Sequence, residues 1–145
     1  MMNRFEHILN QLPYTVPFLF VDQIDILTDN GVEGKYTFNE DAFFYKGHFK
    51  GNPVTPGVIL TECMAQIGVV CLGIHLKAGT ASANTQIALS HHAVDFYIPV
   101  FPGETVTVIS EKEYFRFQKL KCRVKMMNAA GELVCRGVIS GMMVK

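Results

Sequence analysis

The chain has 145 residues, of which 49% are hydrophobic, so residues 1–145 suit one globular domain with a substantial core. Its 13 acidic and 13 basic side chains balance, which argues against nucleic-acid or membrane-surface partners. The N-terminal segment mixes charged with apolar residues, unlike a secretory signal, so we expect a cytoplasmic protein.

The N-terminal residues 4–11 predict a short amphipathic helix with Asn3 as its cap. Residues 19–27 and 32–39 are strand-like, and the turn sequence Asp29-Asn30-Gly31 joins them. The first third of the chain is therefore expected to place a helix before a pair of antiparallel strands.

One long helix is predicted next, with Thr55 as its cap, Pro56 in its first turn and Gly79 at its end. It is apolar nearly all round, and a helix without a polar face must be enclosed. A membrane span is the rival interpretation, but Glu62 and Gln66 interrupt the apolar run. We favour a buried central helix.

The remaining chain alternates between strands and turns. Four further strands are expected, at residues 87–98, 104–115, 119–128 and 132–144. Together these elements predict an α+β fold, in which an antiparallel sheet of about five or six strands wraps around one long central helix.

Residues 119–126 alternate strictly between apolar and basic side chains. The basic face consists of Lys119, Lys121, Arg123 and Lys125. We interpret this face as a solvated strand surface, with contact to an acidic carrier protein as the alternative.

The cysteines lack the C-x-x-C spacing of zinc and redox sites, and their neighbours are apolar. We expect reduced core thiols at Cys63, Cys71, Cys122 and Cys135. No metal site is expected at His91 and His92, because consecutive strand residues point to opposite faces.

Glu62 lies about two turns into the apolar helix, where an unpaired carboxylate is costly. Gln66 is four residues further on, on the same face, and its amide can orient the carboxyl group. Burial would raise the pKa of Glu62, as a general acid requires. The alternatives are a carboxylate that reaches solvent or one that pairs with a buried cation.

His48 lies in the loop of residues 41–56, which is dense in glycine, proline and aromatic residues and is expected to be ordered. A tightly held imidazole there could act as a general base, although a structural histidine is the alternative. Gly57 lies at the start of the helix, where free backbone N–H groups could polarise the carbonyl group of a substrate. The alternative is that glycine is needed only because the junction between loop and helix is crowded.

The segment Phe43–Val58, followed by Glu62-Cys63-Met64-Ala65-Gln66, resembles the signature of the FabZ-type (FabA/FabZ-like) 3-hydroxyacyl-[acyl-carrier-protein] dehydratases. The later Phe96–Glu104 segment and the N-terminal Leu12–Asp22 segment are similar to the same family. The likeness covers essentially the whole chain, with His48 and Glu62 at the family spacing.

This resemblance implies a hot-dog fold paired into a homodimer, or a trimer of dimers, in which His48 of one subunit and Glu62 of the other line a shared tunnel. The substrate would be carried on the phosphopantetheine of an acyl carrier protein. His48 would take the C2 proton, and Glu62 would protonate the departing hydroxyl group. Gly57 and Val58 would hold the thioester oxygen, and Gln66 would orient Glu62. Phe96 and Tyr97 are candidates to line the acyl site, with plain core packing as the alternative for an aromatic residue at a strand end. No metal or other cofactor is expected.

The chain departs from the family pattern in four places. Tyr14-Thr15-Val16 stands where the family usually has His-Arg-Tyr, and Lys50 replaces a usual proline. The Tyr45-Lys46 stretch is one residue longer than usual, and Thr55 replaces a usual methionine. An acyl thioesterase and a non-catalytic acyl-carrier-binding partner subunit remain as alternative functions.

Overall fold

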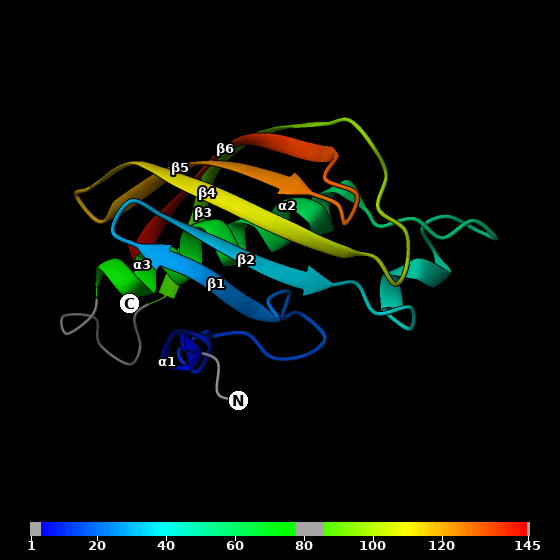
Figure 1. Ribbon diagram of the computed structural model, residues 1–145, viewed down its shortest axis with the longest axis horizontal. Helices are drawn as coiled ribbons and strands as arrows, with labels where there is room; N and C mark the ends of the chain where they lie inside the picture. Colours follow the sequence, from blue (N-terminus) through cyan, green and yellow to red (C-terminus); the bar gives the residue numbers. More distant parts are fainter. Residues whose placement is uncertain (1–3, 78–85, 145) are drawn as a thin grey trace.

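The computed structural model describes residues 4–77 and 86–144, and its sheet curves around a central helix (Figure 1). Within these residues six antiparallel strands form one sheet in the order β1-β2-β4-β5-β6-β3. Their bounds are β1 Gln23–Thr28, β2 Gly31–Thr37, β3 Gln86–Phe96, β4 Thr105–Arg116, β5 Lys119–Met127 and β6 Leu133–Val144. The predicted α+β class and strand number are confirmed.

The β1–β2 hairpin forms as the turn sequence predicted, with Thr28 paired opposite Gly31. The first strand, however, begins at Gln23 rather than at residue 19. The reason is that the backbone N–H of Phe20 donates to the side-chain oxygen of Gln66 on the central helix, at 2.8 Å, instead of joining a strand ladder. The segment before β1 is therefore hydrogen-bonded to the central helix.

The central helix consists of three consecutive segments: α2 Gly57–Ala65, the π-helical segment η2 Gln66–Cys71, and α3 Leu72–Leu76. Residues Gly57–Leu76 have the length and mean hydropathy (1.9) of a membrane span, but 72% of the span is buried inside the protein. This burial identifies it as the core helix of the fold. Its predicted end at Gly79 lies outside the described residues.

The predicted helix cap at Thr55 is wrong. Pro56 occupies the cap position without a side-chain capping bond, and its carbonyl accepts hydrogen bonds from Ile59 and Leu60. The hydroxyl of Thr55 instead lies 2.5 Å from that of Tyr45, because both residues are buried and a buried hydroxyl requires a partner.

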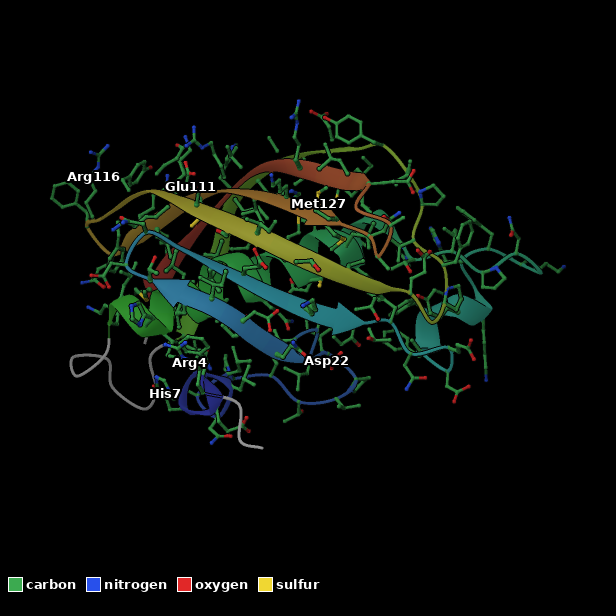
Figure 2. All side chains as sticks on the ribbon, viewed as in Figure 1. Arg4, His7, Asp22, Glu111, Arg116 and Met127 are labelled. Carbon is green, nitrogen blue, oxygen red and sulfur yellow. The ribbon has the colours of Figure 1, made fainter. Side chains whose placement is uncertain are left out.

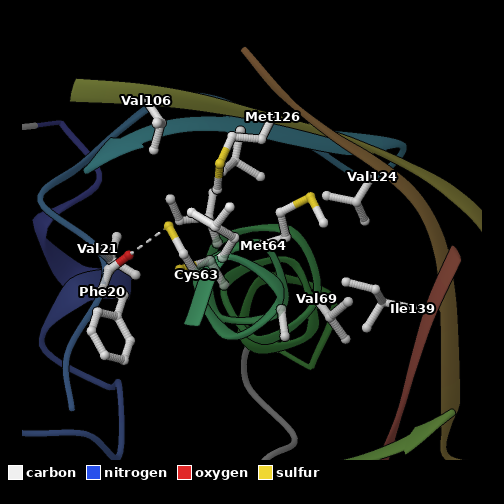
Figure 3. Packing of buried hydrophobic residues seen from close by; sticks show 14 of the residues in the cluster. Phe20, Val21, Cys63, Met64, Val69, Val106, Val124, Met126 and Ile139 are labelled. Carbon is white, nitrogen blue, oxygen red and sulfur yellow. Dashed lines mark hydrogen bonds between the residues drawn. The ribbon is translucent and has the colours of Figure 1, made fainter. Parts of the chain in front are cut away.

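The core lies between the helix and the concave face of the sheet (Figure 3). Met64 and Val69 of the helix point toward side chains of the strands, such as Val124 and Ile139, whereas the thiol of Cys63 points to the carbonyl of Phe20. The predicted alternation of β5 is confirmed, since its apolar members are fully or almost fully buried: Leu120, Cys122, Val124 and Met126. All four cysteines are buried and free, as expected.

Two short helical elements flank the β1–β2 hairpin along the chain. α1 Glu6–Leu9 is shorter than the predicted helix, and Phe5 stands at its start without a side-chain capping bond. The proposed cap, Asn3, lies outside the described residues. The 3-10 turn η1 Phe43–Lys46 begins the loop that contains His48.

Candidate active site

His48 is held in a small, tightly bonded loop. Its carbonyl accepts from the N–H of Val54 at 2.8 Å, and Phe49 and Asn52 exchange two backbone hydrogen bonds at 2.9 Å. Gly51 has a φ of +71°, the left-handed conformation that glycine adopts without strain. The loop is therefore ordered, as its composition predicted.

The imidazole of His48 has a defined orientation. Its Nδ1 lies 2.8 Å from the carbonyl oxygen of Val54. A carbonyl can only accept, so Nδ1 carries a proton, and in the neutral ring the lone pair is then on Nε2. The ring also stacks on Phe49, with centroids 4.0 Å apart. The partly buried histidine thus presents a fixed basic nitrogen.

Glu62 projects from α2, and the amide of Gln66 holds its carboxyl group. The Nε2 of Gln66 donates to Oε2 of Glu62 at 3.0 Å and to the carbonyl of Phe18 at 3.0 Å. Its oxygen accepts from Phe20, so the orientation of this fully buried amide is set by backbone groups. The predicted Glu62–Gln66 contact is present.

Partial burial raises the pKa of Glu62 above its ordinary value, and the hydrogen bond from Gln66 opposes this only in part. Desolvation favours the neutral carboxyl over the carboxylate, since the charged form loses more hydration. Glu62 can therefore retain a proton at a higher pH than an exposed glutamate.

A cavity of about 90 Å³ lies beside Glu62, between the helix and the sheet. Tyr14 and Glu62 are its ionisable lining residues, and its apolar wall consists of Ala65, Val69, Val70, Ile87, Leu89 and Ile139. Burial first, and then the nearby charge of Glu62, raise the pKa of Tyr14 to about 12. The phenol is therefore neutral across the physiological range.

Sequence reasoning missed Tyr14 as a neighbour of Glu62. It noted this position only as a departure from a family pattern. No local signal places Tyr14 beside a glutamate 48 positions away in the chain. The two residues line the same cavity because the segment before β1 is hydrogen-bonded to Gln66.

Gly57 stands at the start of α2, against the ring of Phe96 at the end of β3. A Cβ atom at Gly57 would lie 3.2 Å from that ring, so glycine permits the close approach. The first backbone N–H groups of a helix have no acceptor within the helix. The N–H groups of Gly57 and Val58 are among them. Val58 itself is 76% exposed.

The remaining predicted site residue, Tyr97, follows β3. It is half exposed, and the guanidinium of Arg136 lies over its ring, 5.9 Å from the centroid. The structure thus brings Phe96 to Gly57 and Gln66 to Glu62. His48 is not among the residues that line the cavity beside Glu62, so within one chain these two groups belong to separate clusters.

Two of the four basic side chains of β5, Lys121 and Arg123, form ion pairs with acidic side chains of β4. Glu111, labelled in Figure 2, pairs with Arg123, and Glu113 lies 3.4 Å from Lys121 and 3.8 Å from Arg123. The interpretation as a solvated strand surface is favoured by this pairing. On β3, His91 and His92 pair with successive residues of β6 and so point to opposite faces.

Comparisons with known proteins extend these observations. The family model for the FabA-like domain matches residues 12–139. A 3-hydroxyacyl-[acyl-carrier-protein] dehydratase FabZ from Caldicellulosiruptor saccharolyticus is 37% identical over 138 residues, which cover 90% of this chain and 91% of the relative. The FabZ of Ehrlichia canis is 29% identical, with 88% of each chain covered.

Solved structures show the fold. The dehydratase heterocomplex ApeI:P from Xenorhabdus doucetiae has a TM-score of 0.79 at 15% identity, with 95% of this chain and 91% of that chain covered. A hypothetical thioesterase from Streptococcus pneumoniae, solved with coenzyme A, has a TM-score of 0.63 at 12% identity, with 97% and 94% covered. The predicted hot-dog fold is confirmed.

Proposed function

This chain belongs to the family of FabA-like domains, and we propose on that basis that His48 and Glu62 perform the two proton transfers by which a 3-hydroxyacyl thioester loses water. The protein is a 3-hydroxyacyl-[acyl-carrier-protein] dehydratase of fatty-acid biosynthesis, in agreement with its FabZ-named relatives. These relatives favour this function over the thioesterase and non-catalytic alternatives.

His48 acts as the base. Its Nε2 removes a proton from C2 of the substrate, while the bond from Nδ1 to Val54 keeps the ring in the correct tautomer and stabilises the imidazolium that forms. The observation that carries this assignment is the 2.8 Å contact between Nδ1 and the Val54 carbonyl, since it leaves Nε2 free to accept a proton.

Glu62 acts as the acid. Its proton passes to the 3-hydroxyl group as the C3–O bond breaks, so that water leaves and the C2–C3 double bond forms. The raised pKa of Glu62 maintains the protonated form that this step consumes. Gln66 keeps the carboxyl group directed toward the substrate.

The start of α2 stabilises the intermediate charge. Loss of the C2 proton places negative charge on the thioester oxygen, and the free N–H groups of Gly57 and Val58 supply donors at a helix N-terminus. Phe96, in contact with Gly57, and the adjacent Tyr97 form the wall against which the acyl chain lies.

Two chains are needed to complete the site. β3 is an edge strand, and it exposes Leu89 and Phe96 at 50% and 48%. A second copy that pairs along β3 would cover these side chains and would bring His48 of one subunit to the partner subunit's Glu62. We propose this homodimer, or a trimer of such dimers, as the active form.

The substrate reaches this site on the phosphopantetheine arm of an acyl carrier protein, which we propose as the partner. The proton transfers assigned above need only side chains and backbone donors, so the proposed reaction uses no metal or other cofactor. The proposed location is the cytoplasm.

The test is an assay of the purified protein with 3-hydroxyacyl and trans-2-enoyl thioesters, which it should interconvert. His48→Ala and Glu62→Gln should each lower kcat by about two orders of magnitude or more, as for other general acid–base groups. His75→Ala is a matched control, because His75 binds Asp29 at the far end of the helix. Full activity in both site variants would overturn the assignment.

A further inference from the structure

The mechanism above leaves one buried polar contact unused. The hydroxyl oxygens of Tyr45 and Thr55 lie 2.5 Å apart, and the two residues are only 6% and 4% exposed. Separating two hydroxyl groups withdrawn from water would leave both without a partner. This contact is therefore a strong local constraint on the two chain segments that it joins.

Those two segments are the ends of the loop that carries His48. Tyr45 belongs to η1, before the loop, and Thr55 directly follows Val54, the residue that binds both the carbonyl and the Nδ1 of His48. The N–H of Thr55 donates to the carbonyl of Val100 at 2.9 Å, so this end is also fixed to the body of the protein. The hydroxyl contact closes the loop at its base.

The same contact sets the loop against the helix. Thr55 precedes the first residue of α2, Gly57, by two positions. A displacement of Thr55 would move Val54 and the imidazole relative to the N–H groups of that first turn. The fold thus places two hydroxyl groups that are ten positions apart in the chain in direct contact across the loop.

We propose that Tyr45 and Thr55 are a coupled pair of positioning residues, whose hydroxyl–hydroxyl bond holds the His48 imidazole in its reactive position and tautomer. This inference rests on the proposed function of His48 as the base. Neither hydroxyl touches the substrate. They act through Val54 and the loop.

The first experiment is a double-mutant cycle with Tyr45→Phe, Thr55→Val and the combined variant. Each single change should lower kcat roughly ten-fold, because small displacements of a catalytic group are costly, with a smaller effect on KM. The double variant should resemble either single variant, since the second hydroxyl has no role once the first is removed. Thr55→Ser retains the hydroxyl group and should recover most of the activity.

Tyr114→Phe is the matched control, because it removes a phenol oxygen on β4 that the proposed mechanism does not use. It should leave kcat unchanged. Wild-type kcat in both single variants, or losses that multiply in the double variant, would overturn the coupling. If Tyr45→Phe fails to fold, the contrast between Thr55→Val and Thr55→Ser still decides the outcome.

A second readout does not depend on turnover. Nitrogen-15 NMR of the His48 ring should show one neutral tautomer, protonated at Nδ1, in the wild-type protein and a mixture in Tyr45→Phe. An unchanged spectrum would contradict the proposal even if kcat fell. If His48→Ala retained full activity, the proposed function would fail, whereas the NMR result would still establish whether the pair orients the ring.

Discussion

At the scale of single residues, Glu62 combines a chemical role with a cost in stability. Burial raises its pKa in the folded state, so near that pKa the folded protein binds more protons at this position than the unfolded chain does. Stability therefore falls as pH rises from the unfolded pKa through the folded pKa, and the loss persists above the folded pKa. The sign is opposite to that of a salt-bridged carboxylate.

Replacing Glu62 with glutamine removes this cost and retains an amide that Gln66 can bond. We expect Glu62→Gln to raise Tm at neutral pH by about 2 °C, with a smaller gain at acidic pH, where more of the wild-type Glu62 is protonated. Thermal unfolding at both pH values measures the difference. Glu111→Gln gives up an exposed ion pair with Arg123 and should not raise Tm. A lower Tm for Glu62→Gln at neutral pH would contradict the cost assigned to burial.

The sequence predicted the Glu62–Gln66 contact because side chains four residues apart share a helix face. It could not predict that Phe18 and Phe20 fix the other atoms of the amide, since those partners are 46 to 48 positions away in the chain. The wrong assignment of Thr55 as a cap has the same origin. Its competing partner, Tyr45, becomes available only when the loop folds back.

At the scale of elements, the helix lies so close to the sheet that a side chain at Gly68 would press against two strands. A Cβ atom there would lie 3.0 Å from Val124 and 3.1 Å from Ser110, on two interior strands. The hydroxyl of Ser110 also donates to the carbonyl of Gly68 at 2.8 Å. Neither strand can withdraw without disturbing its pairing on both sides.

Two effects compete in Gly68→Ala. Alanine favours the helix by about 1 kcal/mol, whereas overpacking a fitted core costs about 1–3 kcal/mol, so we expect a net loss of stability. Urea unfolding should show a lower midpoint. Gly47→Ala is the control, because nothing lies within 4 Å of a Cβ built there and its φ is −106°. A Gly68→Ala variant that is more stable than the wild-type protein would contradict the tight packing of the helix against the sheet.

Strand positions were predictable at this scale because turn residues and alternation are local signals. The π-helical segment Gln66–Cys71 was not. A helix that is apolar on all sides has no polar stripe. Its sequence therefore does not indicate where the hydrogen bonding changes from α-helical to π-helical. The start of β1 was missed for a different reason, namely that a helix side chain and not a strand binds the backbone of Phe20.

At the scale of the whole molecule, the sheet closes around the helix on one side and ends at an exposed strand on the other. Within the described part of the chain β3 pairs with β6 along one edge only, and most of its side chains are exposed. The number of strands and the enclosed helix could be predicted from the sequence, because the pattern of apolar residues shows which faces of the helix and the sheet must pack together. The separation of His48 from the Glu62 cavity within one chain was implied only by the family resemblance and not by residue patterns, since it depends on how the loop is placed in three dimensions.

This separation leads to a prediction about two chains. If each site combines His48 of one subunit with the partner subunit's Glu62, a mixed dimer of His48→Ala and Glu62→Gln has one site with both groups intact and one with neither. Co-expression of the two inactive variants should therefore restore about a quarter of wild-type activity, since half of the dimers are mixed and each has one working site.

Tandem affinity tags on the two variants allow the mixed dimer to be purified, and it should have about half of the wild-type kcat per dimer. A site built within one chain would leave every site in the mixed dimer with one group missing, so activity would stay at the level of the single variants. Co-expression of His48→Ala with a second, differently tagged His48→Ala chain controls for recovery caused by association alone. Because no site in that dimer has an imidazole, it should remain inactive.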